Sequence, residues 1–257
     1  MTVYLVGAGP GSPDLLTLRA ARLLAAADIV VHDRLVDSRI LEMAPPTATV
    51  IDAGKYPGGP SDAQAHINTV LVDAARRAAV VVRLKGGDPY VFGRGGEEAV
   101  ALRSAGVEVE VVPGVTSAIA GPAAAGIPVT MRGLSSGFTV VTGHQDPAGT
   151  DPLDWEALAR LGTTLVVLMG ASQAAEIADR LLTAGMAPAT PVAAVESATS
   201  VEQRVLRTRL DELADLAEGT IRAPAVLVVG EVAGLDVADA EFGALVSEMA
   251  SETGGGR

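Results

Sequence analysis

A glycine-rich segment in the first half of the chain combines residue types that suit the binding of a small ligand. Residues 85–98 read KGGDPYVFGRGGEE and follow the apolar run 80–84. Glycines let a backbone approach a ligand closely, Asp88 can accept hydrogen bonds from a ribose or an ammonium group, and Val91 and Phe92 can pack on an adenine ring or a thioether. A flexible connecting loop is the alternative, but the density of glycine here favours a binding loop.

Two charged positions beside this loop have the chemistry to move protons. Asp33 and Arg34 follow the apolar run 28–31, and Lys55 follows the run 49–52. Because ligands bind outside the carboxyl ends of strands in open α/β sheets, these side chains are expected to face one crevice. A carboxylate and an ammonium group in one site can act as general base and general acid. An ion pair with a structural role explains the same residues equally well.

The first glycine-rich turn, residues 7–11, reads GAGPG and partly matches a dinucleotide-binding turn. That turn needs the pattern G-x-G-x-x-G and an acid about 20 residues later. Here the third glycine comes one place early, and Pro10 has no N–H to offer a phosphate. Asp28 and Asp33 stand where a ribose-binding acid would, so a nicotinamide-dependent oxidoreductase stays an alternative. A tight turn between a strand and a helix is the simpler interpretation.

Short apolar runs alternate with segments of helical periodicity, which predicts the elements that position these residues. The expected strands are 3–6, 28–31, 49–52, 80–84, 108–112, 137–142, 163–169, 192–196, 204–208 and 225–229. The expected helices are 15–27, 61–77, 95–105, 155–161, 172–184 and 210–217. We therefore expect an α/β protein with a mostly parallel sheet in an N-terminal domain (1–113), a mixed sheet in a C-terminal domain (114–235) and a weakly structured tail (236–257).

Composition excludes several classes of protein. The net charge of −12 argues against general nucleic-acid binding. The chain has no cysteine, which excludes disulfides and thiolate chemistry, and its three histidines are far apart, so no metal site is expected. No stretch approaches the ~20 apolar residues of a membrane span, and the start lacks a signal-peptide pattern. We expect a cytoplasmic protein.

Further segments carry a family resemblance that extends from Val3 to about residue 232. They are, in chain order, VGAGPGSPDLLTLRA, ADIVVHDRLV, the Gly54-Lys55 pair, RLKGGDPYVFGRGGEE, VVPGVTSAIAGPAAAGIPVT, VTGH, VVLMG, PVAAVESAT and PAVLVVG. On these motifs the chain resembles the uroporphyrinogen-III C-methyltransferases of the tetrapyrrole methylase superfamily. The run GGDPYVFGRGGEE with DRLV upstream is specific to that group, because cobalt-precorrin methyltransferases and diphthine synthase share GAGPG but have a shorter loop.

The resemblance implies a two-domain α/β fold that binds S-adenosylmethionine in the cleft between its domains, without a metal. It implies two methyl transfers that convert uroporphyrinogen III to precorrin-2, for sirohaem or cobalamin, with S-adenosylhomocysteine as the other product, and a homodimer. It assigns proton acceptor and donor to Asp33 and Lys55. Its cofactor contacts fall on Pro10, Gly86, Gly87, Asp88, Val91, Phe92, Thr116, Ser117, Met169 and Ala198.

The substrate of such an enzyme carries many carboxylates, although this chain is acidic. A locally cationic cleft can still attract an anionic ligand. We expect that cleft to hold Arg34, Lys55, Arg83, Lys85, Arg94 and Arg132, with Arg34, Arg94 and Arg132 as substrate contacts. The chain departs from the family pattern at 56–60 and at Met131, where the family has a histidine. The alternatives are another corrinoid-precursor methyltransferase, diphthine synthase, a nicotinamide-binding oxidoreductase and a non-catalytic cofactor-binding module.

Overall fold

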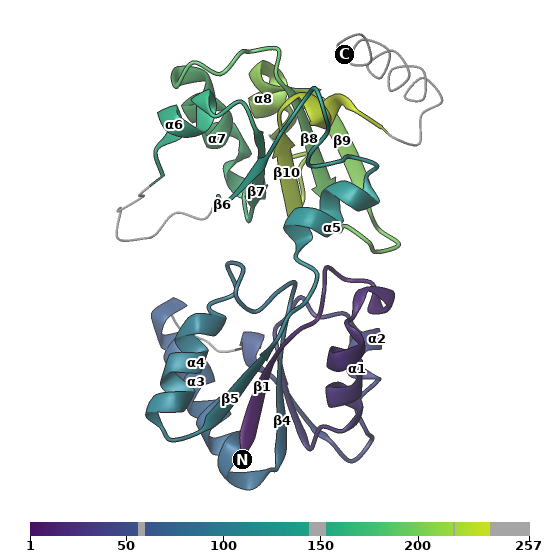
Figure 1. Ribbon diagram of the computed structural model, residues 1–257, viewed down its shortest axis with the longest axis vertical. Coiled ribbons are helices and arrows are strands. Elements are labelled where there is room, and N and C mark those ends of the chain that lie inside the picture. The colour runs from purple at the N-terminus through teal and green to yellow at the C-terminus, as the bar shows by residue number, and fades with distance from the viewer. Residues whose placement is uncertain (56–59, 144–152, 218, 237–257) are drawn as a thin grey trace, which may run out of the picture. The chain divides into compact units, whose positions relative to one another are not determined.

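The computed structural model describes residues 1–55, 60–143, 153–217 and 219–236 (Figure 1). The chain divides into two compact units, Met1–Thr116 and a second unit that begins at Ser117. Outside the described residues lie most of the predicted tail 236–257 (from 237 on), His144 of the VTGH motif, and residues 56–59 of the departure at 56–60.

The first unit is built on a five-stranded sheet in which every neighbouring pair of strands is parallel, as predicted. The strand order is β3-β2-β4-β1-β5. The strands are β1 (Thr2–Gly7), β2 (Ile29–His32), β3 (Thr49–Asp52), β4 (Val80–Lys85) and β5 (Glu108–Val112). Burial on both faces explains why β2 and β4 read as nearly continuous apolar runs.

Helices cover both faces of this sheet (Figure 1). The helices are α1 (Leu18–Ala25), α2 (Ser38–Leu41), α3 (Pro60–Arg77) and α4 (Gly95–Ser104). Leu71 of α3 and Leu102 of α4 pack with Val81 of β4 on one face. Leu24 of α1 packs with Val82 of β4 on the other face, in a core that includes α2. Side chains at odd-numbered positions of β4 therefore point toward α3 and α4.

The first helix begins later than its sequence pattern predicts, at Leu18 rather than at Leu15. The Thr17 hydroxyl accepts a hydrogen bond from the backbone N–H of Ala20 at 3.1 Å, and Thr17 itself is extended (φ −68°, ψ 148°). Residues 13–15 form a separate 3-10 turn. The proline and the acid fit a first turn of either kind, so the threonine cap sets where the α-helix starts.

The second unit contains a mixed sheet, as predicted, and its five strands lie in the order β6-β7-β10-β8-β9. Only β6 and β7 are parallel, and the other three neighbouring pairs are antiparallel. The strands are β6 (Phe138–Thr142), β7 (Thr164–Leu168), β8 (Pro191–Glu196), β9 (Arg204–Arg209) and β10 (Ala225–Val229). The helices are α5 (Ser117–Ala124), α6 (Trp155–Arg160), α7 (Ala174–Thr183) and α8 (Leu213–Ala217).

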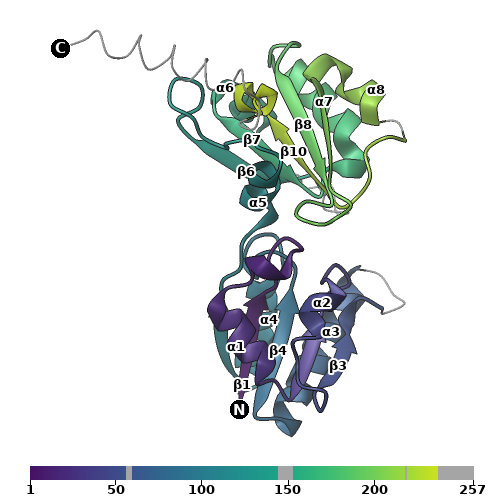
Figure 2. The same ribbon diagram turned by 90° about the vertical axis from the view of Figure 1, so that its right-hand side faces the viewer.

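The helices of the second unit are divided between the two faces of its sheet (Figure 2). Leu181 of α7 and Leu213 of α8 pack in one core with Val167 of β7. Ala118 of α5 packs with Val166 of β7 in a core on the other face. The start of α5 is thereby fixed against the edge of the sheet where the candidate residues of this unit lie.

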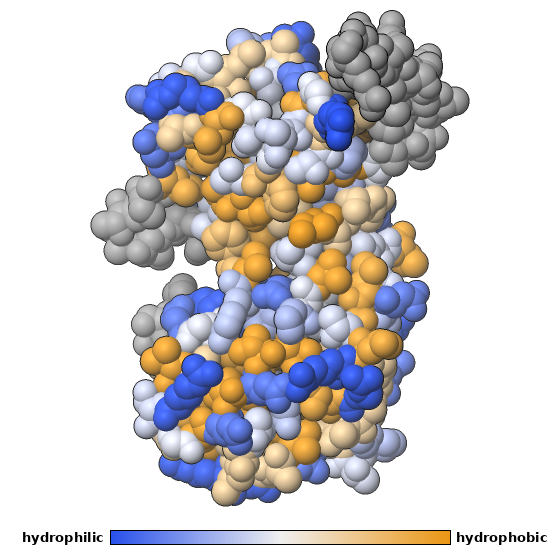
Figure 3. Space-filling view, viewed as in Figure 1, coloured by the Kyte–Doolittle hydropathy of each residue, from blue (hydrophilic) through white to orange (hydrophobic). Residues whose placement is uncertain are grey.

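The outer surface of the first unit mixes residue types. On the face that Figure 3 shows, hydrophilic and hydrophobic residues alternate rather than gather on one side. In the described parts of the chain, no helix is both long and apolar enough to cross a membrane.

Candidate functional site

The parallel sheet brings the predicted proton-transfer residues to one edge. Asp33 follows the last residue of β2, and its backbone N–H donates a hydrogen bond to the carbonyl of Leu84 on β4 at 3.1 Å. Gly54 lies in the short 3-10 turn after β3 and is so close to Arg34 that a Cβ on Gly54 would stand 2.8 Å from the Cβ of Arg34. The backbones of residues 33–34 and of Gly54-Lys55 thus meet, while the Lys55 side chain lies outside the described residues.

Four glycines at this edge pack backbone against backbone. Gly9 and Gly87 exchange hydrogen bonds, with distances of 2.7 Å from Gly87 N to Gly9 O and 3.2 Å from Gly9 N to Gly87 O. A Cβ on Gly114 would stand 2.2 Å from the Gly87 carbonyl oxygen, and one on Gly7 would stand 2.5 Å from the Gly114 Cα. The turn 7–11 therefore needs glycine for close contact with two neighbouring loops, which is the simpler of its two interpretations.

Asp88 holds the glycine-rich loop to the rest of the unit. Its Oδ1 accepts a hydrogen bond from the Tyr90 backbone N–H at 2.8 Å, and its Oδ2 accepts one from the Gly114 backbone N–H at 3.1 Å. Each carboxylate oxygen can accept a further hydrogen bond. The space around Gly86 is open, with no atom within 4 Å of a Cβ built there. The loop is fixed at Asp88 and leaves its Gly86 backbone free to meet a ligand.

Beyond Asp88 the loop takes an unusual backbone conformation. Phe92 (φ 51°) and Arg94 (φ 56°) are left-handed although neither is glycine. Non-glycine residues in this region carry strain, which collects at functional sites. Phe92 is also exposed. Its side chain is therefore free to cover a ligand at the loop.

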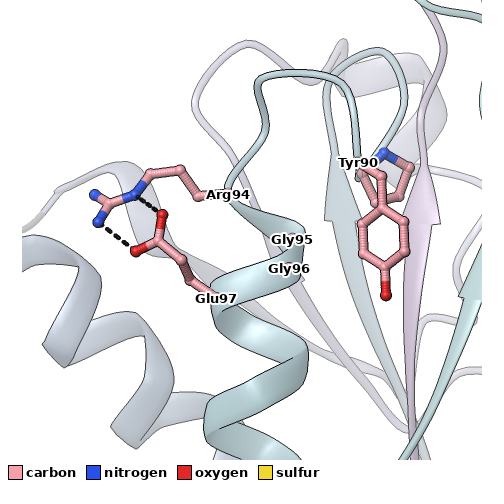
Figure 4. Close-up of a pocket in the computed structure, with 6 residues that line it drawn as sticks. Tyr90, Arg94, Gly95, Gly96 and Glu97 are labelled. Atoms are coloured by element: carbon pink, nitrogen blue, oxygen red, sulfur yellow. Dashed lines mark hydrogen bonds and ion pairs between the residues drawn. The ribbon is translucent and has the colours of Figure 1, made fainter. Parts of the chain in front are cut away.

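Arg94 is held at the first turn of α4 by Glu97. The Arg94 Nε and Nη2 atoms lie 2.8 and 2.7 Å from the two carboxylate oxygens of Glu97 (Figure 4). This hydrogen bonding raises the pKa of the Arg94 guanidinium and lowers that of the Glu97 carboxyl. The pair borders a pocket of about 420 Å³ whose lining is Pro89, Tyr90, Arg94, Gly95, Gly96 and Glu97.

Three buried charged side chains between β4 and α4 form a cluster with the partly buried Asp33 at the end of β2. Arg83, Lys85 and Glu98 are 1%, 2% and 0% exposed. One oxygen of Glu98, Oε1, accepts hydrogen bonds from Arg83 Nε (3.1 Å), Arg83 Nη2 (3.0 Å) and Lys85 Nζ (2.9 Å). Arg83 Nη2 also donates to Asp33 Oδ1, and Lys85 Nζ lies 3.9 Å from Asp33 Oδ2. We call these four residues the charge cluster.

The charge cluster corrects the expectation that Arg83 and Lys85 belong to a cationic cleft. Both side chains are buried because odd-numbered residues of β4 face the covering helices. Burial, followed by the neighbouring charge of Arg83, lowers the pKa of Lys85. Neither cation is exposed to an incoming anion, and both interact with carboxylates of the protein instead.

Glu98 was missed by the sequence interpretation, which treated it only as the end of a motif. A signal was present, since two cations two residues apart in an apolar strand face the same side and need a buried counter-ion. The helix that follows the strand supplies Glu98 for this purpose.

The second unit gathers its own candidate residues at one edge of the mixed sheet. Both β7 and β8 run antiparallel to β10, and their last residues pair with Val226 and Ala225 at its start. Met169 follows β7 with a left-handed backbone (φ 56°) and is 50% exposed. Ala198 follows β8, between two further left-handed residues at 197 and 199.

Helix α5 reaches the same edge. A Cβ on Gly121 would stand 3.7 Å from the Cβ of Ala198 and 3.2 Å from the Val226 Cγ2. Ser117 is the first residue of this helix, and Thr116 is the last residue of the first unit. The structure thus places Ala198, Met169 and helix α5, which begins at Ser117, at one sheet edge of the second unit. In the first unit it brings the turn that holds Pro10 against the loop that holds Asp88 and Val91.

The remaining predicted substrate contacts are exposed arginines. Arg34 lies at the sheet edge of the first unit, and Arg132 lies in the connection between α5 and β6 of the second unit. Among the residues that the structure describes, no three histidine, aspartate or glutamate side chains gather as a metal site requires.

Comparisons with known proteins agree with this geometry. A family model described as tetrapyrrole (corrin/porphyrin) methylases matches residues 2–214. An S-adenosyl-L-methionine-dependent uroporphyrinogen III methyltransferase of Methanosarcina barkeri is 53% identical over 90% of this chain and 91% of its own length. A uroporphyrinogen-III C-methyltransferase of Pseudomonas aeruginosa is 51% identical over 90% of this chain and 93% of its own.

Solved structures show the same similarity. A uroporphyrin-III C-methyltransferase of Thermus thermophilus in complex with S-adenosylhomocysteine is 46% identical to this chain, with a TM-score of 0.78. The match covers 91% of this chain and 94% of the other chain. A cobalt precorrin-4 methyltransferase is 28% identical, with a TM-score of 0.81 over 91% of this chain and 96% of its own.

Proposed function

Because this chain belongs to the tetrapyrrole (corrin/porphyrin) methylase family, we propose that it transfers two methyl groups from S-adenosylmethionine to carbon atoms of uroporphyrinogen III, which gives precorrin-2. The observation that carries this proposal is the similarity to two uroporphyrinogen methyltransferases at 53% and 51% identity over nearly the whole of both chains. The more distant cobalt precorrin-4 methyltransferase, at 28% identity, supports the fold more than the substrate.

The product would enter sirohaem or cobalamin synthesis. The relatives include a siroheme synthase of Chromobacterium violaceum that is 49% identical and of which this chain covers 49%. This chain matches about half of that longer protein. Such a match agrees with a chain that carries out the methyl transfer, while the other half of the longer protein carries out other steps on the same macrocycle.

The residues present fit S-adenosylmethionine, which supplies an electrophilic methyl group on a sulfonium. In the first unit, the Asp88-anchored loop offers open backbone at Gly86 and exposed apolar surface at Phe92. In the second unit, Met169 and Ala198 lie together at one sheet edge with α5. A sulfonium is a cation and needs no phosphate-binding turn, which agrees with the structural role of the turn 7–11. The full proposed set is Pro10, Gly86, Gly87, Asp88, Val91, Phe92, Thr116, Ser117, Met169 and Ala198.

Methyl transfer to a ring carbon is an in-line displacement, so the protein's main task is to align the two reacting atoms. Each transfer adds a methyl cation, so the methylated ring system must lose one proton; a second proton, delivered at another position as the double bonds move, is matched by a further proton lost to solvent. Asp33, at the sheet edge, would accept the first proton. Lys55, whose backbone follows Gly54 beside Arg34, would donate the second.

Exposed arginines would anchor the carboxylates of the substrate. Arg34 at the edge of the first unit and Arg132 in the second are candidates, together with Arg94 at the start of α4. The glutamate paired with Arg94 fixes its guanidinium in one place. Glu97 offsets the charge of Arg94, so the local positive charge that can bind an anion on this acidic protein would come from Arg34 and Arg132.

The proposal is tested by incubating the protein with radiolabelled S-adenosylmethionine and enzymatically made uroporphyrinogen III. We expect two labels per macrocycle, determined by mass spectrometry after oxidation of the product. An unlabelled macrocycle would refute the proposal, and label appearing only on a later corrinoid precursor would move the assignment to another methyltransferase of the family. Quenching of nicotinamide fluorescence would instead favour the oxidoreductase alternative.

The homodimer and the cytoplasmic location stay predictions from the sequence. The oligomeric state is measured by light scattering on the purified protein, and fractionation of the source cells checks the location.

A further inference from the structure

We propose that Glu98 is a positioning residue for Asp33. It fixes Arg83 and Lys85 behind the Asp33 carboxylate, and it balances one of their two positive charges while Asp33 balances the other. This inference rests on the proposed function, in which Asp33 accepts a proton from the methylated macrocycle. Glu98 itself is fully buried and does not touch the substrate.

Hydrogen bonds within the charge cluster link Glu98 to Asp33 through Arg83. The Oε1 atom of Glu98 accepts two hydrogen bonds from Arg83 and one from Lys85, at 2.9 to 3.1 Å. The same Nη2 atom of Arg83 bonds both Glu98 and Asp33. Glu98 therefore helps to hold the guanidinium that bonds the Asp33 carboxylate, together with the backbone carbonyls of Val31 and Leu84, which accept hydrogen bonds from Arg83 Nη1 at 3.5 and 3.4 Å.

Charge counting gives the second step of the argument. Arg83 and Lys85 are two buried cations, and Asp33 and Glu98 are two carboxylates, so the charge cluster as a whole is neutral. Without Glu98, both cations would have Asp33 as their sole counter-ion within the cluster. Glu98 thus supplies the second negative charge that the two cations require, so that Asp33 is not the only carboxylate they attract.

Packing alone does not explain a charged residue at this position. Its second oxygen, Oε2, is buried and accepts no hydrogen bond from the described residues. An unsatisfied buried acceptor lowers stability, and a buried ion pair is in general no more stabilising than well-packed apolar residues of similar volume. A group kept at this site for packing alone would not need the negative charge.

The first test is a double-mutant cycle between Glu98→Gln and Asp33→Asn, with uroporphyrinogen III as substrate. Glu98→Gln keeps the shape of the side chain and one acceptor oxygen but removes the charge. We expect it to lower kcat about 10-fold, with the affinity for S-adenosylhomocysteine unchanged in calorimetry. In the Asp33→Asn background the same change should lower kcat by less than about 2-fold, because its effect passes through Asp33. An equal loss in both backgrounds would overturn the proposal.

The second test restores the charge balance without restoring Glu98. The double variant Lys85→Met/Glu98→Gln removes one cation with one anion, leaving Arg83 and Asp33 as a balanced pair. We expect kcat to recover to within about 3-fold of the wild type, and a double variant as slow as Glu98→Gln would overturn the proposal. If Glu98→Gln does not fold, the double variant alone tests the proposal. A kcat more than about 10-fold below that of the wild type, with a normal thermal melt, would then count against the proposal.

A control variant and the activity of the wild type separate a failure of this inference from a failure of the proposed function. Asp73→Asn removes an exposed carboxylate that pairs with Arg76 on α3, and it should leave kcat unchanged. A wild-type protein that does not methylate uroporphyrinogen III would refute the proposed function and this inference with it. A wild-type protein that does methylate it, with independent effects of Glu98 and Asp33, would refute the inference alone.

Discussion

Asp88 and Gly114 are joined across two loops, since the Oδ2 atom of Asp88 accepts a hydrogen bond from the Gly114 backbone N–H at 3.1 Å. The other oxygen, Oδ1, holds the Tyr90 N–H within its own loop. One side chain thus ties the glycine-rich loop to the chain segment that follows β5. Both loops leave the same edge of the parallel sheet, so this tie fixes their spacing where the cofactor is proposed to bind.

Replacing Asp88 with asparagine should weaken cofactor binding. The change turns one acceptor oxygen into an NH2 donor that faces a backbone N–H, so one of the two hydrogen bonds is lost and two donors oppose each other. Loss of such a bond costs about 1–3 kcal/mol, which corresponds to an affinity for S-adenosylhomocysteine reduced about 5- to 150-fold. Titration calorimetry measures this, with Asp73→Asn as the control. An unchanged affinity would show that the tie does not support binding.

Replacing Gly114 with alanine should destabilise the first unit. The new Cβ would lie 2.2 Å from the Gly87 carbonyl oxygen and 2.7 Å from the Gly7 Cα, and none of these backbone atoms can move freely. Overpacking of this kind lowers the free energy of unfolding by about 1–3 kcal/mol.

Chemical denaturation of the Gly114→Ala variant measures the loss of stability. Gly96→Ala is the matched control, because a Cβ there meets no atom within 4 Å and Gly96 lies in α4. That variant should be as stable as the wild type or more stable by up to about 1 kcal/mol. Equal stability of the two variants would contradict the close contact of the three loops.

The positions of the strands along the chain followed from the sequence, because apolar, β-branched runs such as 80–84 and 225–229 leave little choice. The start of α1 was wrong because proline and an acid suit any first turn, whereas the cap formed by Thr17 becomes visible only in three dimensions. The close approach of Gly7 to Gly114 was also hidden, since it joins parts of the chain separated by more than 100 residues.

The site followed from the sequence unevenly. Motifs placed Asp33 and Asp88 at a sheet edge, which the structure shows. Charge alone placed Arg83 and Lys85 in an open cleft, and this was wrong. Sequence gives the sign of a side chain's charge, but whether that charge meets solvent or Glu98 depends on which face of β4 the helices cover.

Substitutions of Met169 test the backbone strain at the edge of the mixed sheet where β7 and β8 end. Its left-handed conformation (φ 56°) suits glycine better than methionine. Met169→Gly should therefore leave the melting temperature near that of the wild type, because relief of about 1 kcal/mol of strain offsets the lost side-chain packing. The affinity for S-adenosylhomocysteine should nevertheless fall, because the exposed side chain that would contact the cofactor is gone.

Met169→Ala is the matched variant for this prediction. It removes the same contacts but keeps a Cβ on the strained backbone, so both the melting temperature and the affinity should fall. Thermal melts and calorimetry on the two variants separate strain from contact. If Met169→Gly binds the cofactor as tightly as the wild type, the side chain has no part in the site.

Arg34 and Arg132 should anchor the substrate rather than take part in the methyl transfer. Neutralising either with glutamine removes a favourable charge for an anionic macrocycle, so KM should rise about 10-fold while kcat changes less. The effect should shrink at high salt, because screening weakens exposed charge interactions. Steady-state kinetics at two ionic strengths test this, with Arg160→Gln, whose partner is Glu156 on α6, as the control. A fall in kcat with unchanged KM would contradict anchoring.

Glu196 gives the second unit a pH-dependent element of stability at the end of β8. It is buried, and its Oε2 accepts a hydrogen bond from Arg204 Nε at 2.8 Å while its Oε1 accepts one from the Arg222 backbone N–H at 2.7 Å. Burial alone would raise the pKa of this carboxyl, but the hydrogen bonds from Arg204 and Arg222 outweigh burial and hold the pKa below its ordinary 4.5. The residues that follow, 197–199, form the strained loop around Ala198.

A carboxyl whose pKa is lower in the folded state stabilises the protein above its unfolded pKa, here about 4.5, and this stabilisation is lost as the pH falls through the folded pKa. Arg204→Gln removes the partner, so it should lower the melting temperature at pH 7, and the difference from the wild type should shrink as the pH drops below 4.5. Thermal melts across this pH range measure it. Arg209→Gln, which breaks an exposed pair with Asp211, should change little at any pH. A difference for Arg204→Gln that persists undiminished in acid would show that the arginine stabilises the loop by packing and not through the charge of Glu196.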